Sequence, residues 1–251
     1  MKRMLKMHIR TNGIVIREQT ISENDKLVTL LTQERGVIRA FAHGAKSPRS
    51  RKSVATQLFC YCDFDIYFGK GIFSVDEATV KETFFELQSS IQDLALAQYF
   101  CELACELSPR EEPAGDYLKL LLNACHMLVK KKRDRRLLKP IVELRFLTMA
   151  GYMPDLLGCE VCGAFESETM YFNSAKGELF CDKCNNNKSN KPISISTVTA
   201  MRHVAFSESE KLFSFNLKEG AMREFNEAVE EYLLRVTMRS YKTLDFYKIT
   251  E

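Results

Sequence analysis

Residues 36–68, GVIRAFAHGAKSPRSRKSVATQLFCYCDFDIYF, contain two strand-like runs separated by a long polar loop. The first run, GVIRAFA, follows a glycine turn, and the second, LFCYCDFDIYF, alternates aromatic residues with small or acidic ones. Alternation of this kind is typical of a β-strand with one face in a core. The connecting segment HGAKSPRSRKSVA is rich in Gly, Ser, Pro and basic residues. The stretch therefore predicts two strands joined by a long basic loop.

Three more strands flank this stretch. GIVIRE (13–18) and KLVTLLT (26–32) are short β-branched runs, and IFSVDEATV (72–80) follows the turn GKG. Five short strands with turn signals between them fit a small barrel, and a span of roughly 75 residues is the size of an OB-fold. SH3-like barrels share that size, so both remain open. We predict an N-terminal OB-fold β-barrel over residues 1–80.

The hydrophobic period then changes from strand to helix. SIQDLALAQYFCELACEL (90–107) is apolar around most of its circumference, as in a helix buried between others. DYLKLLLNACHMLVKKK (116–132) keeps one apolar face. LLKPIVELRFLTMAGY (137–152) adds a third helix, with Pro140 in its first turn or at a kink. These segments form the first part of a helical domain, residues 81–155.

The second part of the helical domain is predicted over residues 191–251. NNNKSNKPIS (185–194) has the composition of a polar linker. STVTAMRHVAF is expected to be a short helix with Ser196 or Thr197 as its N-cap. GAMREFNEAVEEYLLRVTMRS (220–240) places apolar residues on one helical face and charges on the other.

Two C-x-x-C pairs, separated by eighteen residues, interrupt the helices between residues 156 and 190. Paired motifs at this interval are typical of zinc ribbons and knuckles, and four thiolates saturate a tetrahedral ion without an open position for water. A thioredoxin-like redox pair is the alternative, but no βαβ pattern surrounds either motif. We predict one structural zinc ion per chain. Its ligands would be Cys159, Cys162, Cys181 and Cys184. The predicted fold class is thus an α+β multidomain protein: an OB-fold barrel followed by a helical domain with an inserted four-cysteine zinc module.

The chain has a formal net charge of +3, but the charge is unevenly distributed. Residues 1–80 contain 13 Lys or Arg against 8 Asp or Glu. One window, RGVIRAFAHGAKSPRSRK, has no acidic residue, and a cationic surface on a barrel suits a phosphate backbone. The alternative is an ordinary solvated loop. The candidate nucleic-acid-binding residues are Arg35, Arg39, Lys46, Arg49, Arg51 and Lys52.

A second cationic run, KKKRDRRLLK (130–139), closes one predicted helix and opens the next. Cations at a helix C-terminus favour the helix electrostatically, so a capping role competes with binding of an acidic ligand. No phosphate-binding loop, GxGxxG motif or HExxH motif occurs, and an enzymatic function finds no support. With no apolar stretch long enough to cross a membrane and no signal-peptide core, the expected location is the cytoplasm.

Two segments resemble the bacterial recombination mediator family RecO. The more specific is VELRFLTMAGYMPDLLGCEVCG (142–163), in which a helix is followed by Gly-Tyr-x-Pro and the first C-x-x-C. The other is GIVIREQTISENDKLVTLLTQERGVIRAFAHGAKSPRSRK (13–52), a strand, a polar turn, a second strand and a basic loop. With the barrel and helices, the resemblance covers nearly the whole chain.

The resemblance implies a non-hydrolytic DNA repair and recombination protein, cytoplasmic and associated with the nucleoid. Such a protein binds single- and double-stranded DNA and anneals complementary strands. With RecR it helps to load RecA on DNA covered by single-stranded-DNA-binding protein, whose acidic C-terminal tail it recognises. A peptide of that kind requires cations beside apolar side chains, here near Leu137 and Leu138. The candidate partner-binding residues are Arg133, Arg135, Arg136 and Lys139.

Two other classes remain open at this stage. A zinc-ribbon RNA-binding or ribosome-associated factor would also combine a barrel with a zinc module, and it would prefer RNA to single-stranded DNA in competition. An enzyme with a zinc-dependent site would need an open metal position, which four thiolates do not leave.

Overall fold

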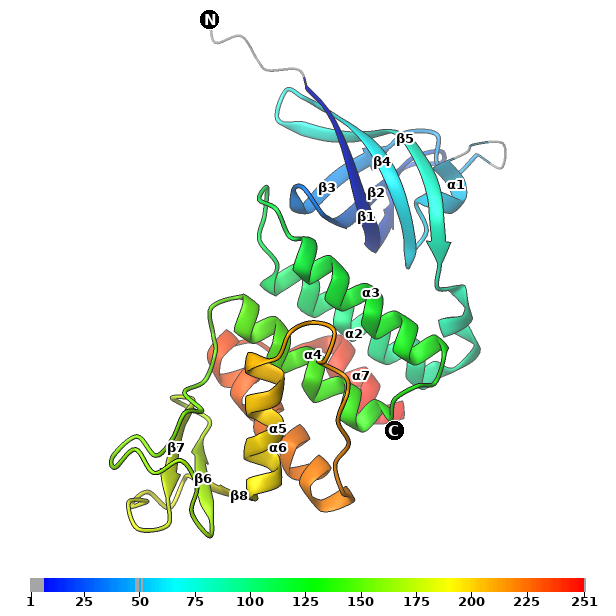
Figure 1. Cartoon of the computed structure of the whole chain (residues 1–251). Helices are drawn as coiled ribbons and strands as arrows, with labels where there is room; N and C mark the ends of the chain where they lie inside the picture. The colour runs from blue at the N-terminus through cyan, green and yellow to red at the C-terminus, as the bar shows by residue number, and fades with distance from the viewer. Residues whose placement is uncertain (1–6, 48–49, 51, 251) are drawn as a thin grey trace, which may run out of the picture. The chain divides into compact units, whose positions relative to one another are not determined.

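A computed structural model describes residues 7–47, 50 and 52–250 (Figure 1). The chain divides into two compact units. The first comprises Met1–Val129 with Phe246–Glu251, and the second comprises Lys130–Asp245. Across the described ranges, no helix is both long enough and apolar enough to cross a membrane.

The first unit begins with a closed five-stranded barrel, in the order β1-β2-β3-β5-β4. Its strands are β1 (Met7–Thr20), β2 (Lys26–Thr32), β3 (Gly36–Ala42), β4 (Cys60–Gly69) and β5 (Ile72–Thr83). All neighbours are antiparallel except β3 and β5, which pair in parallel through Ala40 and Phe73. A short helix, α1 (Lys52–Ala55), lies between β3 and β4 in the chain. This is the five-stranded Greek-key barrel of an OB-fold, so the predicted fold class is confirmed.

Alternation along β3 shows how the sequence builds the barrel. Ala40 and Ala42 are fully buried, whereas Arg39 is exposed and Phe41 is partly exposed. Small inward residues let the larger Val15, Leu30 and Phe64 fill the interior.

Helices follow the barrel in the first unit. The elements are η1 (Phe85–Ser89), α2 (Ile91–Leu107) and α3 (Gly115–Val129). The Ser90 hydroxyl caps α2 by accepting a hydrogen bond from the Asp93 amide. The segment between α2 and α3 pairs with the start of β3: the Val37 amide donates to the Pro109 carbonyl at 2.9 Å. Gly36 makes this possible, because its φ is +56° and an added Cβ would lie 2.1 Å from the Pro109 oxygen.

The helices of the second unit are α4 (Arg135–Met149), α5 (Ile195–Phe206) and α6 (Glu219–Thr237), followed by α7 (Lys242–Thr250), whose last residues belong to the first unit. Pro140 lies inside α4, and Asp134 caps that helix. The predicted N-cap of α5 was wrong. Ser194 caps it, rather than Ser196 or Thr197, by accepting from the Thr197 amide.

A three-stranded antiparallel sheet lies between α4 and α5 in the chain. Its strands are β6 (Met170–Asn173), β7 (Glu178–Cys181) and β8 (Lys191–Ile193), in the order β7-β6-β8. The polar linker predicted over residues 185–194 was therefore wrong at its end. Lys191–Ile193 pairs with β6, and Pro192 is tolerated because β8 is an edge strand.

Candidate metal centre and nucleic-acid interface

Tight turns hold each pair of cysteines. In the first, the Gly163 amide donates to the Cys159 carbonyl at 2.8 Å, and Gly163 adopts a φ of +71° that favours glycine. In the second, the amides of Cys184 and Asn185 both donate to the Cys181 carbonyl. Each turn directs two sulfur atoms to the same side of the backbone.

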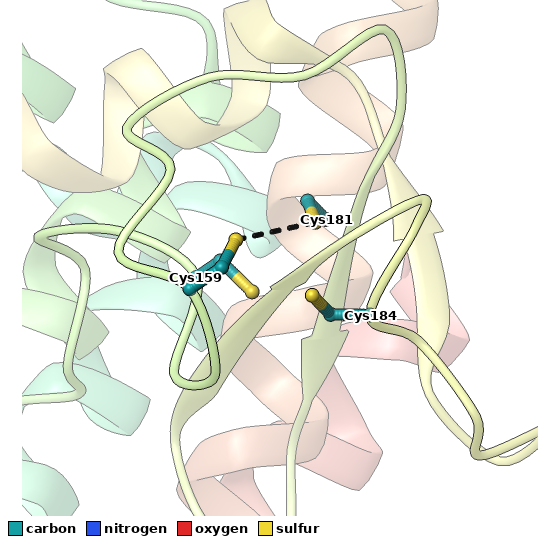
Figure 2. Close-up of side chains that lie close together, drawn as sticks. Cys159, Cys181 and Cys184 are labelled. Carbon is teal, nitrogen blue, oxygen red and sulfur yellow. Dashed lines mark hydrogen bonds between the residues drawn. The ribbon is translucent and has the colours of Figure 1, made fainter.

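The two turns converge on one point. The Sγ atoms of Cys159, Cys162, Cys181 and Cys184 all lie within 4.8 Å of one another. Figure 2 shows the sulfur atoms of Cys159, Cys181 and Cys184 directed toward a common centre. The Cys162 and Cys181 sulfurs are 3.7 Å apart. Zn–S bonds of ~2.3 Å in a tetrahedron place neighbouring sulfurs ~3.8 Å apart, so the spacing and the all-thiolate donor set fit zinc.

The cluster favours ionised thiols unequally. Burial raises the pKa of the Cys159 thiol, but the backbone amides of Cys181, Cys162 and Val161 donate to the sulfur and together lower that pKa to about 6. The neighbouring thiols of Cys181 and Cys162 raise the pKa of Cys184 to about 12. The first negative charge thus forms readily, whereas the last is opposed by its neighbours. A bound cation would remove this repulsion.

Side chains from α5 and α6 anchor the module that contains the thiols. Arg202 of α5 donates to the carbonyls of Leu156 and Phe165, each at 2.7 Å, and its guanidinium lies 3.7 Å from the Phe165 ring centre. Glu231 of α6 forms an ion pair with Lys191 of β8, with 2.7 Å between the Lys191 Nζ and the Glu231 carboxylate. Sequence patterns gave no signal for these anchors, since Arg202 and Glu231 occupy ordinary polar positions on their helices.

The candidate DNA-binding cations lie along β3 and the segment that follows it. Arg35 precedes the strand, Arg39 is exposed in its middle, and Lys46 is exposed beyond its end. Lys52 opens α1 and its Nζ donates to the Val75 carbonyl of β5 at 3.3 Å. We call these four residues the β3 stripe; the strand alone is roughly 20 Å long at ~3.3 Å per residue. The other two candidates, Arg49 and Arg51, lie outside the residues that the structure describes.

The outward face of β3 also presents aromatic rings. Arg39, Phe41 and His43 alternate with the buried alanines, so they share one face. The Phe41 and His43 rings are stacked, with centroids 6.0 Å apart and planes 8° from parallel. Asp25 holds the imidazole of His43, 3.5 Å from its Nδ1.

Arg133 and Arg136 of the second cationic run are engaged within their own unit. Arg133 donates to the Asn216 side chain at 2.7 Å, and Arg136 contacts Glu219 at 2.6 Å and Asp134 at 2.7 Å. Arg135 is half-buried and is also engaged.

Lys139 is the buried member of this run. Only 1% of the residue is exposed, and its Nζ lies 2.9 Å from Glu143 and from Glu230. Burial opposes its charge, but Glu143 and Glu230 outweigh that effect and raise the pKa of Lys139. Its ammonium is therefore committed to the interior, which argues against a direct contact with a peptide.

Comparison with known families gives two adjacent matches. The model "Recombination protein O N terminal" matches residues 7–84, and "Recombination protein O C terminal" matches residues 88–245. The chain belongs to the recombination protein O, or RecO, family. The N-terminal RecO model covers the barrel, and the C-terminal model includes all four metal-ligand candidates. The resemblance seen in the sequence is confirmed.

Curated RecO relatives match along almost their whole length. A "DNA repair protein RecO" from Acetivibrio thermocellus is 31% identical over 242 residues, which is 96% of this chain and 96% of the relative. The relative of the same name from Dehalococcoides mccartyi is 29% identical, again over 96% of both chains. That from Symbiobacterium thermophilum is 30% identical over 94% of both. This chain is thus a DNA repair protein of the RecO family.

Proposed function

We propose that the protein binds single- and double-stranded DNA through the β3 stripe and anneals complementary strands without nucleotide hydrolysis. The observation that supports this most directly is the exposed face of β3. Arg39, which has neither an ion pair nor a side-chain hydrogen bond among the described residues, lies there beside the stacked rings of Phe41 and His43. Unpaired cations beside an exposed ring are the combination that binds a phosphate backbone and stacks bases.

Annealing follows from the same electrostatics. Two DNA strands repel each other through their phosphates, and cations that contact both strands reduce this repulsion while the bases remain free to pair. Contacts to phosphate are independent of base sequence, so one surface would serve any complementary pair. The step needs no enzyme chemistry, in keeping with a repair mediator that positions DNA and catalyses no bond change.

Partners complete the proposed role. With RecR, the protein would help to load RecA onto DNA coated by single-stranded-DNA-binding protein, at the nucleoid in the cytoplasm. The acidic tail of the coating protein would bind near the start of α4, where Arg133, Arg135 and Arg136 lie beside one another in the chain. Lys139 would support this site from inside, by holding α4 against α6 through Glu230.

The four cysteines would hold one zinc ion. A bound zinc would supply a structural cross-link between the two turns, and four thiolates leave it no position for water or substrate. Side chains of the protein would then hold the cross-linked module against the helices: Arg202 connects the first turn to α5, and Lys191 with Glu231 connects the sheet to α6.

The decisive experiment is annealing of two complementary oligonucleotides by the purified protein without ATP. We expect annealing well above the spontaneous rate, and a several-fold loss with Arg39→Ala. The matched control is Arg10→Ala on β1, because Arg10 is also exposed but lies 3.6 Å from Asp65 and already has a partner. No acceleration of annealing, together with preference for RNA over single-stranded DNA, would overturn the proposal and favour an RNA-binding factor.

A further inference from the structure

A pocket of about 300 Å³ lies within the first unit, on the outer surface of the barrel. Its lining includes three arginines and no carboxylate. The residues that line it are Arg17, Gln19, Thr29, Val37, Arg39, Cys105 and Arg110. Of these, only Arg39 belongs to the β3 stripe.

Strand register places three of these side chains in a row. Arg17 of β1 is opposite Thr29 of β2, and Thr29 is opposite Arg39 of β3. Directly opposite residues have Cβ atoms about 5 Å apart, so Arg17 and Arg39 flank Thr29 at about 10 Å from each other. Both arginine side chains are long enough to meet above the Thr29 hydroxyl.

A β-bulge creates this row. Val15 is opposite Leu30, but the next matched pair is Arg17 with Thr29, so Ile16 is the extra residue. In a regular ladder, Ile16 would face Thr29. The bulge instead places Arg17 there, and Ile16 is buried. Bulges often re-aim a side chain at a functional site, and this one adds a cation to the surface.

Arg110 lies in the segment after α2, and the pairing of its backbone with Gly36 holds this segment against the start of β3. Its backbone forms a bridge with Gly36, next to the bond between Val37 and Pro109. The thiol of Cys105 on α2 lies close enough to Arg110 and Arg17 for their charges to affect its pKa. Burial raises the pKa of its thiol, while the charges of Arg110 and then Arg17 act in the opposite direction. Glu106 and Glu102 on the same helix also influence that thiol, but neither lines the pocket.

The polar groups of the pocket lack partners. Arg17, Arg39 and Arg110 make no side-chain hydrogen bond or ion pair within residues 7–47, 50 and 52–250. Thr29 is only 6% exposed, and its hydroxyl likewise has no partner in the part of the chain that the structure describes. This hydroxyl is not one of the fully buried atoms that lack a partner, so it remains accessible from the pocket and can donate to a ligand there.

We propose that Arg17, Arg39 and Arg110, together with the Thr29 hydroxyl, form a binding pocket for a phosphate group. Guanidinium groups bind phosphate oxygens with charge-assisted, geometrically specific hydrogen bonds, and a hydroxyl donates one more. The phosphate belongs either to a DNA backbone or to a free phosphate compound. The DNA alternative rests on the proposed function, and it extends the DNA path from the β3 stripe across β2 to β1 and the α2–α3 segment.

The test uses Arg17→Gln/Arg110→Gln, which leaves every residue of the β3 stripe intact. Arg10→Gln is the matched control on the same strand. Two measurements are made on the full chain: the shift in melting temperature caused by pyrophosphate, and the affinity for oligothymidylate as a function of salt. Thr29→Val adds a variant of almost unchanged shape, which lacks only the hydroxyl.

We expect the pyrophosphate shift to disappear in the double variant and to persist in the control. If the ligand is DNA, oligothymidylate affinity should also fall about tenfold, with a salt slope about one to two units shallower. If the ligand is a free phosphate compound, DNA affinity stays constant while the pyrophosphate shift is lost. Retention of both the shift and the DNA affinity in the double variant would overturn the pocket. A wild-type protein that responds to pyrophosphate but binds no DNA would refute the proposed function and leave the pocket standing.

Discussion

Several cations of the second unit and the pocket arginines of the first unit are used in opposite ways. In the second, Lys139 and Arg136 are neutralised by neighbouring carboxylates, and Arg202 is saturated by backbone carbonyls. In the first, Arg17, Arg39 and Arg110 have no such partners among the described residues. Both units contain runs of basic residues, so the density of charge in the sequence does not distinguish them. What sets the pocket arginines apart is that no carboxylate lines their pocket, whereas Arg10 and Lys26 of the same unit are paired with acidic residues.

This contrast predicts that substitutions in the two units have different effects, which experiments can test. Substitutions of charged or metal-binding groups in the second unit should reduce stability and leave binding of naked DNA nearly unchanged. Substitutions on the outward face of the barrel should reduce DNA binding and leave stability unchanged.

The largest effect is expected from loss of the metal. Substituting Cys162 or Cys181 by Ser should abolish zinc binding and remove on the order of 10 kcal/mol of local folding energy, by analogy with zinc-finger peptides. Because Arg202 and Glu231 connect the module to α5 and α6, the melting temperature and solubility should fall as well. Metal analysis gives the zinc content, and calorimetry gives the stability. Absence of zinc from the reduced wild-type protein would contradict the assignment of the site.

The buried ion pair should give the next largest effect. Lys139→Met leaves Glu143 fully buried without its cation, a change that typically costs about 3–5 kcal/mol. Arg136→Gln is the control in the same helix: its side chain is 49% exposed, and ion pairs at exposed positions contribute little to stability because solvent screens them. Chemical denaturation, followed by circular dichroism, gives the free energy of unfolding of the Lys139→Met and Arg136→Gln variants for comparison with the wild type.

A double variant then separates the ion pair from simple packing. Lys139→Met/Glu143→Leu should recover much of the lost stability, because the fully buried carboxylate of Glu143 is removed together with its cation, whereas the Glu230 side chain is 18% exposed and stays partly solvated. Equal midpoints for Lys139→Met and Arg136→Gln would show that the two cations do not differ as their burial indicates.

On the barrel, the expected effect is on binding rather than stability. If about six cations contact a single strand, log affinity should fall against log salt with a slope near −4. Arg35→Ala/Arg39→Ala should make this slope about one to two units shallower for any DNA sequence, with an unchanged melting temperature. An unchanged slope in a stable variant would place the DNA elsewhere.

Much of this architecture could be predicted from local patterns. Alternation in GVIRAFA predicts a strand with inward alanines, and two C-x-x-C motifs predict converging turns, because both depend on residues close in the chain. Helix α7 and strand β8 were not anticipated. The first is short with mixed polarity, and the second is a three-residue edge strand that contains a proline.

The cationic pocket was harder to predict for a different reason. Arg17 is followed by Glu18, and Arg110 is followed by Glu111 and Glu112, so neither stands out in a charge profile. Their alignment depends on a bulge and on a contact between segments more than seventy residues apart, Gly36 with Arg110. Conversely, the run from 130 to 139 stood out in the sequence, although its lysine at 139 is internal.

The smallest effect is expected at the proposed peptide site, because the cations there are already paired within the protein and would also have to bind a ligand. Arg135→Glu/Arg136→Glu should weaken an acidic, Phe-terminated peptide by only several-fold, because Arg136 is already paired with Asp134 and Glu219 and a peptide must compete with them. Glu219→Gln sharpens the test. It releases Arg136 from one competitor and should strengthen peptide binding, whereas a site elsewhere would not respond. Fluorescence anisotropy of a labelled peptide measures both variants, and a labelled oligonucleotide serves as the control ligand. Equal losses for peptide and DNA would identify a general electrostatic patch, and an unchanged peptide affinity in both variants would remove the start of α4 from the site.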